Sequence, residues 1–273
     1  MPRDDLTARL DEAIACARAG GAYTLEAFHA GVVMAERKGD GTPVTATDRG
    51  CERLIRERIA ASFPNDGMLG EEFGDEPGSS GYRWIIDPID GTFSFMHGVP
   101  LYTTLIGIER ISGDGGRGKG DDGEVVAGVI YAPALDEMVY AMSGGGAWHT
   151  VSGAEPTPAR VSKTPTLAEA TVSTTSLDYW DDPAGWLAID RACAHTRGWA
   201  DAYAVLLVAT GRCDAVIESN VHPWDVAPFG PILAEAGGLF TDWRGRTTAH
   251  TDTVVVSNGL VHDALLGLVG ADH

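Results

Sequence analysis

The chain has 273 residues, of which 44% are hydrophobic and 22% are charged, as in a globular protein with a sizeable core. Its 20 basic and 39 acidic residues give a net charge of −19. That charge argues against nucleic acid and anionic membranes as partners, but not against a phosphorylated substrate whose charge metal ions neutralise.

The cysteines and the N-terminus fit a cytoplasmic protein. The four cysteines have no zinc or redox spacing, so each is expected to be reduced and buried on a helix. The charged N-terminus has no apolar signal core, and the longest apolar run is too short to span a bilayer. We therefore expect a cytoplasmic location.

The first half mixes helices with strands. Apolar residues three and four apart predict a helix over residues 4–29, and a turn-rich stretch predicts a hairpin within 32–45. A second helix is predicted from Thr47 or Asp48 to about Phe63, with Asp48 as a possible cap. Strands are predicted at 84–86, 101–109, 125–131, 138–142 and 147–151, and a mobile Gly-rich loop at 111–123.

The second half alternates strand and helix patterns. A segment rich in Pro, Ser and Thr, residues 151–165, is the candidate boundary between halves 1–155 and 156–273. Strands are predicted at 170–173, 215–217, 239–241 and 253–257, and helices at 182–194, 204–210, 225–236 and 262–269. Alternation of this kind predicts a layered α/β fold in which helices cover the sheets.

The most informative stretch follows the apolar run that ends at Ile86. Its residues are Asp87, Pro88, Ile89, Asp90, Gly91 and Thr92. Proline should stop the strand, which leaves two carboxylates beyond its end, where α/β sheets often bind ligands. Glycine and the amides of a helix start suit a phosphate held by a divalent cation. The same residues are also ordinary at a strand-to-helix turn, so both interpretations stay open.

Other acids have ordinary explanations when each is taken alone. Glu71 and Glu72 lie between glycines on a predicted loop, where acids are usually solvated, and Asp225 follows Trp224 at a predicted helix start, where it can act as a cap. Hard cations such as Mg²⁺ nevertheless take oxygen ligands, chiefly carboxylates and backbone carbonyls. The histidines show no metal-ligand spacing, and no Gly-x-Ser-x-Gly nucleophile motif occurs.

Three motifs together resemble the inositol monophosphatase superfamily, whose members are Mg²⁺-dependent, lithium-sensitive phosphomonoesterases. The motifs are Gly70-Glu71-Glu72, Asp87-Pro88-Ile89-Asp90-Gly91-Thr92, and Trp224-Asp225 followed by eleven residues and Gly237-Gly238. Residues 45–48 also resemble the family's segment at the start of its second helix. The resemblance covers nearly the whole chain and implies an αβαβα sandwich and a homodimer.

The resemblance also implies roles for individual residues. Metal ligands would be Glu71, Asp87, the Ile89 carbonyl, Asp90 and Asp225, and the amides of Gly91 and Thr92 would hold the phosphate. Thr92, Asp48 and Glu71 would orient the attacking water. Two or three Mg²⁺ ions are implied, with direct in-line attack and no phosphoenzyme. The role of Glu72 is not assigned, and Ser94 departs from the Asn of many relatives.

The substrate is expected to be histidinol phosphate. The segment from Arg197 to Tyr203 is similar to the histidinol-phosphate phosphatase branch, where an acid stands at the position of Asp201, although Ala200 departs from that branch's Gly. Asp90, Asp201, Glu218 and Asp225 are the candidate substrate-binding residues. Asp201 can instead be a helix cap. The alternatives are inositol phosphate, a sugar or nucleotide phosphate, and an inactive binding protein on the same fold.

Overall fold

The structure is a computed structural model that describes residues 3–31, 35–37, 43–111, 123–180, 182–199 and 201–269. The helices are α1 (Arg3–Ala30), α2 (Ala46–Ser62), α3 (Thr92–Met96), α4 (Ala184–Ala192), α5 (Asp201–Ala209), α6 (Pro223–Val226), α7 (Phe229–Ala236) and α8 (His262–Val269). Short 3-10 turns cover Pro133–Leu135, Leu167–Glu169 and Leu177–Tyr179. Among these residues, no helix is long and apolar enough to cross a membrane.

The strands form two large sheets and one short hairpin. They are β1 (Ala35–Arg37), β2 (Pro43–Thr45), β3 (Gly67–Gly70), β4 (Gly74–Glu76), β5 (Tyr82–Asp90), β6 (Thr103–Arg110), β7 (Glu124–Ala132), β8 (Glu137–Met142), β9 (Gly146–Val151), β10 (Thr157–Pro158), β11 (Thr171–Ser173), β12 (His195–Arg197), β13 (Ala215–Ser219), β14 (Leu239–Thr241) and β15 (Thr253–Ser257). The eight-stranded sheet has the order β10-β9-β8-β7-β6-β5-β3-β4, and the five-stranded sheet has the order β12-β11-β13-β15-β14. In the larger sheet β3 and β5 are parallel, whereas the other neighbours are antiparallel.

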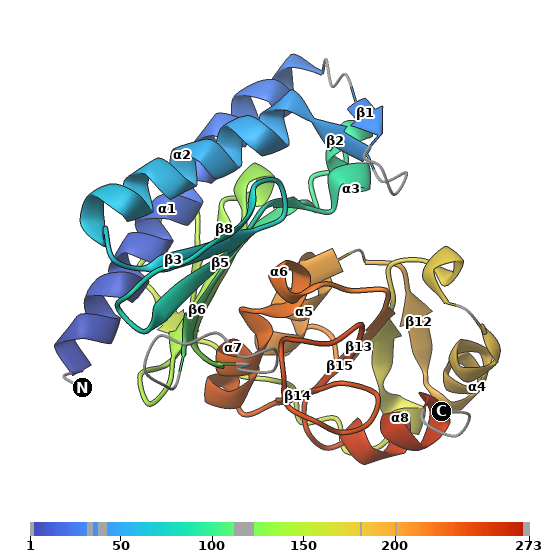
Figure 1. Ribbon diagram of the computed structural model, residues 1–273. Helices are drawn as coiled ribbons and strands as arrows, with labels where there is room; N and C mark the ends of the chain where they lie inside the picture. The colour runs from blue at the N-terminus through green and yellow to red at the C-terminus, as the bar shows by residue number, and fades with distance from the viewer. Residues whose placement is uncertain are drawn as a thin grey trace.

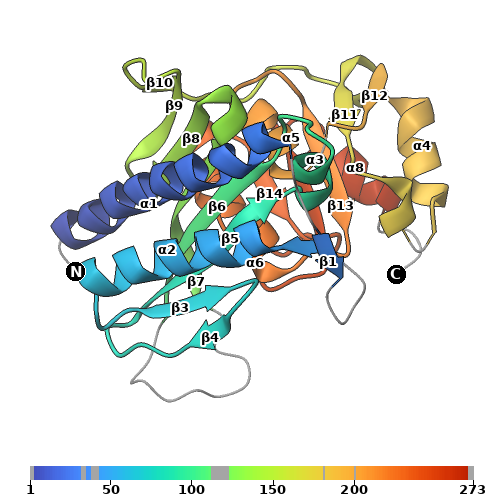
Figure 2. The same cartoon turned by 90° about the horizontal axis from the view of Figure 1, so that it is seen from above.

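Helices and sheets stack in alternating layers, as Figures 1 and 2 show. α1 and α2 cover the outer face of the larger sheet, α5 to α7 lie between the sheets, and α4 and α8 cover the far face of the smaller sheet. Strand β5 is covered by helices on both of its faces. Trp84 and Ile86 pack under α1 and α2, whereas Ile85 belongs to the core beneath α5 and α7. Alternate residues of a strand point to opposite faces, so a strand covered on both sides is apolar throughout.

The layered sandwich and most of the predicted elements are confirmed. Strands β14 and β15 and helix α8 coincide with their predicted ranges, and the predicted hairpin is the antiparallel pair β1–β2. Most of the Gly-rich segment 111–123 lies outside the described residues. The boundary near residue 155 stays a prediction, and β10, which lies just beyond it, still pairs with β9.

Several predicted details were wrong. β5 does not stop at Ile86 but runs to Asp90, because the pairing with β6 is irregular between Asp87 and Asp90 and a bulge tolerates Pro88. The helix predicted at 225–236 is two helices, since α7 begins only after Pro228. The cysteines also depart from expectation. Cys16 and Cys51 are buried on helices, whereas buried Cys213 and half-buried Cys193 follow the ends of α5 and α4.

Two short strands and the start of α5 were not predicted either. β4 and β12 were missed because each has only three residues, and β12 also depends on pairing with the distant strand β11, whereas β4 forms a hairpin with the adjacent β3. α5 begins at Asp201 rather than at residue 204, and Asp201 itself has a left-handed backbone with φ of 53°. Such a backbone is uncommon outside glycine, so an apolar helical pattern does not predict it.

Glycine in β7 lets the segment between α6 and α7 approach the larger sheet. A Cβ at Gly128 would lie 2.6 Å from both the Cα and the carbonyl oxygen of Pro228. These are backbone atoms, so the clash cannot be relieved by rotating a side chain. The close approach therefore holds the segment that directly follows α6, the helix that carries Asp225.

We expect Gly128→Ala to destabilise the protein by about 1–3 kcal/mol, as overpacking typically does. The measurement is the free energy of unfolding in urea. Gly267→Ala is the matched control, since a Cβ there meets nothing within 4 Å on α8. That change should be neutral or stabilise the helix by up to about 1 kcal/mol. Equal stability of the two variants would show that the sheet and the α6–α7 segment do not need the glycine.

Candidate active site

Parallel pairing of β3 and β5 brings the first two acidic motifs to one edge of the sheet. Gly70 pairs with Ile86, so Glu71 leaves β3 beside the point where β5 reaches Asp87. The Glu71 amide donates a hydrogen bond to the Ile86 carbonyl over 3.2 Å. The two motifs are therefore neighbours because both strands run in the same direction.

The end of β5 is held by its own side chains. The Ile89 amide donates to the Asp87 carboxylate over 3.0 Å, and the Thr92 hydroxyl donates to the Ile89 carbonyl over 3.1 Å. Between them Gly91 has a φ of 79°, a left-handed conformation that favours glycine. Thr92 then begins α3. The motif is thus an ordered turn held by its own side chains, and both Asp87 and Ile89 are buried.

Asp90 links this turn to α5 across the space between the sheets. Its Oδ2 accepts hydrogen bonds from the Thr103 hydroxyl over 2.7 Å and from the Ala202 amide over 2.9 Å. A carboxylate of β5 therefore caps the first turn of α5. The contact brings Asp201 so close that a Cβ at Gly91 would lie 2.7 Å from its Oδ2. Position 91 thus favours glycine for two reasons, its φ and the approach of Asp201.

Asp225 reaches the site from α6, which packs against β5. Its Oδ2 accepts a hydrogen bond from the His222 amide over 2.7 Å, which fixes the start of the helix. The rings of His222 and Trp224 stack at 5.0 Å with an interplanar angle of 3°. Asp225 is the third residue of α6 rather than the first residue of a long helix, and its side chain is 27% exposed.

Thr175 joins Asp201 and Glu218, two of the four acids that were predicted to contact substrate. Its hydroxyl lies 2.9 Å from Glu218 Oε1 and 3.4 Å from Asp201 Oδ1, and it accepts a hydrogen bond from the Asp201 amide over 2.9 Å. The Thr175 amide also donates to Glu218 over 2.7 Å. Glu218 lies on β13 and is buried, whereas Asp201 is half-buried. The two acids are therefore adjacent.

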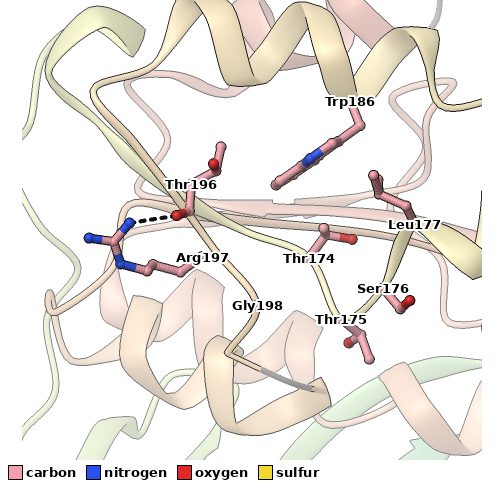
Figure 3. A pocket seen from close by; sticks show the side chains of 8 residues that line it. All are labelled: Thr174, Thr175, Ser176, Leu177, Trp186, Thr196, Arg197 and Gly198. Carbon is pink, nitrogen blue, oxygen red and sulfur yellow. Dashed lines mark hydrogen bonds between the residues drawn. The ribbon is translucent and has the colours of Figure 1, made fainter.

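A polar groove of about 290 Å³ continues from Thr175 toward α4. Figure 3 shows Trp186 of α4 on one side of it and Thr196 and Arg197 of β12 on another. The Arg197 guanidinium donates to the carbonyl of Thr196, so it is turned along β12. The groove borders Thr174 and Thr175, whose hydroxyls contact Glu218, and extends the site away from the β5 motif.

Electrostatics shows that the acids form one neighbourhood. Burial raises the pKa of Asp87, and the charges of Glu71, Asp90 and Asp225 raise it further. Burial and the charges of Asp201 and Asp225 likewise raise the pKa of Asp90. Like charges that are removed from water disfavour ionisation of one another. A cation would relieve that cost.

The second pair of acids is affected in the same way. Burial, followed by the charge of Asp225, raises the pKa of Asp201 to about 6. Burial, followed by the charge of Asp201, raises the pKa of Glu218 to about 8. Perturbed carboxyl groups of this kind are typical of functional sites.

Comparison with known proteins gives the chain a family. The model of the inositol monophosphatase family matches residues 5–271. The chain belongs to the inositol monophosphatase family. It is accordingly a phosphoric monoester hydrolase, and a small phosphorylated molecule is its substrate. The family is metal-dependent, typically on Mg²⁺.

Individual members of the family are similar over most of their length. A histidinol-phosphatase of Chlorobaculum parvum is 39% identical, over 94% of this chain and 92% of that protein. A histidinol-phosphatase of Streptomyces coelicolor is 36% identical, over 92% of each chain. The solved structure of a Thermotoga maritima IMPase superimposes with a TM-score of 0.80 at 33% identity, covering 96% of each chain.

The donor set suits the metal that the family uses. Carboxylates and a carbonyl are the ligands that Mg²⁺ prefers, and several of these carboxylates are buried next to one another. Within the described ranges, however, no three Asp, Glu, His or Cys side chains surround one point closely enough to hold an ion. The chemistry of the site therefore fits Mg²⁺, and the individual ligands remain predictions.

The remaining predicted residues lie around this centre. Asp48 is in the first turn of α2, buried, and its charge acts on the Cys51 thiol, which contacts the Pro88 carbonyl. Asp48 therefore lies on the α2 side of the β5 motif. Ser94 is buried on α3 and accepts the amide of Val99 at its carbonyl. The motif's departure at this position thus faces the protein interior.

Three residues in or next to the site belong to none of the motifs recognised in the sequence. Thr103 and Thr175 are contributed by distant segments, and only tertiary contacts bring their hydroxyls to Asp90 and Glu218. Glu52 of α2 accepts hydrogen bonds from the amides of Glu72 and Phe73, in the turn that follows Glu71. It differs from the two threonines because the sequence contains a signal for it. It falls on the same face of α2 as Asp48, Ile55 and Ile59, where a charged residue is unexpected.

Proposed function

We propose that this protein is a Mg²⁺-dependent phosphatase of histidinol phosphate, releasing histidinol and inorganic phosphate. The observation that carries the substrate is the pair Asp201 and Glu218, two carboxylates joined through Thr175 next to the Gly91 turn. Histidinol phosphate has an ammonium group and an imidazole beside its phosphate. The names of the similar proteins from Chlorobaculum parvum and Streptomyces coelicolor support the same substrate.

The metal ligands proposed are Glu71, Asp87, the Ile89 carbonyl, Asp90 and Asp225. When bound, Mg²⁺ supplies a positive charge that activates water and stabilises the attacking and leaving oxygens. The proposal is supported by the raised pKa of Asp87, which burial and neighbouring acids cause, since those acids need a cation to ionise together. Two or three ions and inhibition by lithium are expected from the family.

The turn after β5 is proposed to hold the phosphate. The amides of Gly91 and Thr92 would donate to phosphate oxygens, and the Thr92 hydroxyl, with Asp48 and Glu71, would orient the water. The hydroxyl donates to the Ile89 carbonyl, which leaves its lone pairs able to accept from water. Water would then attack phosphorus in line while the bond from phosphorus to the substrate oxygen breaks, and the proton that the water gives up would pass to that oxygen.

The acids beyond the turn are proposed to select the substrate. A carboxylate accepts hydrogen bonds from hydroxyl groups as well as from ammonium, so Glu218 alone discriminates little. A second carboxylate at Asp201 favours a cation, because charge-assisted hydrogen bonds are roughly twice as strong as neutral ones. Inositol phosphate stays the second candidate, supported by the similarity to the Thermotoga maritima IMPase.

The substrate is tested by a screen of phosphate release. Histidinol phosphate, inositol phosphate, fructose bisphosphate and adenosine bisphosphate would each be assayed with Mg²⁺ and again with excess chelator. We expect the highest kcat/KM with histidinol phosphate and no activity in chelator. A preference for inositol phosphate would overturn the assignment of histidinol phosphate as the substrate but would leave the proposed metal chemistry intact. Full activity in chelator would reject the metal chemistry itself. A homodimer and a cytoplasmic location stay predictions.

We expect Thr92→Ala to lower kcat while KM for histidinol phosphate changes little. The substitution keeps the backbone amide that holds the phosphate and removes the hydroxyl that orients the water. Steady-state kinetics separates the two contributions, because loss of an interaction made only in the transition state lowers kcat. A raised KM with unchanged kcat would instead mean that Thr92 contributes to uniform binding. Ser94→Ala on the same short helix is the control for local packing.

A further inference from the structure

A buried carboxylate on α2 contacts the turn that carries Glu71 and Glu72. Glu52 has no exposed surface, and α2 lies over β3 and β5 in Figure 1. Its Oε2 accepts the Glu72 amide over 2.7 Å, and its Oε1 accepts the Phe73 amide over 3.3 Å. Removal of a charge from water is costly unless the charge is paired and hydrogen-bonded, so these contacts account for a glutamate at this position.

Arg56, which lies one helical turn further along α2, contacts both Glu52 and the same turn. Its Nε donates to Glu52 Oε1 over 2.8 Å, and its Nη2 donates to the carbonyl of Gly74. The pair therefore holds amides in the middle of the turn and a carbonyl at its end. Nη1 also reaches the exposed side chain of Glu76 over 3.3 Å, a surface ion pair of the kind that contributes little.

The end of β3 is shaped to admit Glu52. A Cβ at Gly70 would lie 2.0 Å from Glu52 Oε1 and 2.5 Å from its Cδ. A side chain at position 70 would therefore displace the carboxylate from the turn. The glycine before Glu71 is thus required by the contact between α2 and the turn, and not by an unusual φ.

We propose that Glu52, together with Arg56, is a positioning residue that fixes the 71–74 turn so that Glu71 points to the metal site. The inference rests on the proposed role of Glu71 as a Mg²⁺ ligand. Outer partners that orient ligands typically contribute 10- to 100-fold to metal affinity or activity. Glu52 would act through the backbone of the turn and not by touching metal or substrate.

Mg²⁺ binding to Glu52→Gln, Glu71→Gln and the double variant tests this, measured by titration calorimetry without substrate. Glutamine keeps the size of the side chain, but its NH₂ group would face one of the donors that the carboxylate accepts, which are the amides of Glu72 and Phe73 and the guanidinium of Arg56. We expect Glu52→Gln to weaken Mg²⁺ binding by about 10- to 100-fold. In the Glu71→Gln background the same change should add no further loss. Glu76→Gln, which removes only the surface partner of Arg56, is the matched control and should bind Mg²⁺ as the unmodified protein does.

The outcomes separate the two proposals. Unchanged Mg²⁺ binding by Glu52→Gln, or an equal additional loss in the Glu71→Gln background, would overturn the positioning role while Glu71 stays a ligand. Unchanged binding by Glu71→Gln would overturn the ligand assignment, and the inference with it. If Glu52→Gln does not fold, Arg56→Met provides the second test. Hydrogen exchange at amides 72 and 73 should then quicken while exchange in α1 stays constant, and unchanged exchange would overturn the proposal.

Discussion

Replacing Asp90 with asparagine is expected to lower the rate of phosphate release by about 10²-fold or more. Thr103 and Ala202 both donate to Oδ2 of Asp90, and asparagine keeps the shape and one oxygen that can accept from both, so α5 should stay in place. What is lost is the negative charge, which the proposal assigns to a metal ligand. The fold should therefore survive while activity falls.

Thermal unfolding with and without Mg²⁺ checks that explanation independently of activity. A ligand that binds only the folded state stabilises it by about 2.7 kcal/mol at a concentration 100 times its Kd. We expect the rise in Tm with Mg²⁺ to be smaller in Asp90→Asn than in the unmodified protein. Asp11→Asn, an exposed change on α1, is the control for the loss of one negative charge. An active variant with a full Mg²⁺-dependent rise in Tm would remove Asp90 from the ligand set.

Replacing Asp201 with asparagine is expected to raise KM for histidinol phosphate about ten-fold more than KM for glycerol phosphate. That ratio corresponds to about 1.4 kcal/mol, the difference between a charged and a neutral hydrogen bond. Asparagine is the mildest replacement here, because it tolerates the left-handed backbone at φ 53° better than most residues. Strain should therefore contribute little to the result.

Glycerol phosphate is the internal control, since its alcohol is uncharged. Asp178→Asn, an exposed change on a nearby 3-10 turn, controls for a general loss of attraction toward cations. Equal losses on both substrates would mean that Asp201 serves only the structure of α5. The Thr175 hydroxyl, which accepts the Asp201 amide, makes that structural role a real alternative.

Local patterns were sufficient for elements whose apolar residues alone mark the extent of the helix or strand. α8 matched its predicted range because apolar spacing of the helical kind survives when a helix packs one face on a core. β15 matched because its three consecutive valines, which are buried on both faces of the sheet, are a local signal of a covered strand. Local patterns failed where a contact with a distant segment decided where an element begins or ends. β5 continues through Pro88 because the pairing with β6 becomes irregular there, and the helix predicted at 225–236 is divided where Pro228 contacts the sheet at Gly128.

The site divides in the same way. The motifs around Glu71, Asp87 and Asp225 were recognisable from the sequence alone, because their spacing within short segments matches the family. Glu52 shows the limit of that approach. Its place on an apolar helix face was visible, but its partners, the amides of the turn after β3, are about twenty residues away and depend on how α2 packs.

By itself, then, the sequence determined the family, the layered fold and the segments that carry the acids. Only the tertiary structure decided which acids meet. The parallel pairing of β3 and β5 set Glu71 beside Asp87, and the hydrogen bond from the Ala202 amide to Asp90 drew Asp201 against Gly91. The physical reason is the separation in sequence over which each kind of interaction acts. Hydrophobic periodicity and turn chemistry act over a few residues, whereas strand pairing and buried hydrogen bonds join residues far apart in the chain.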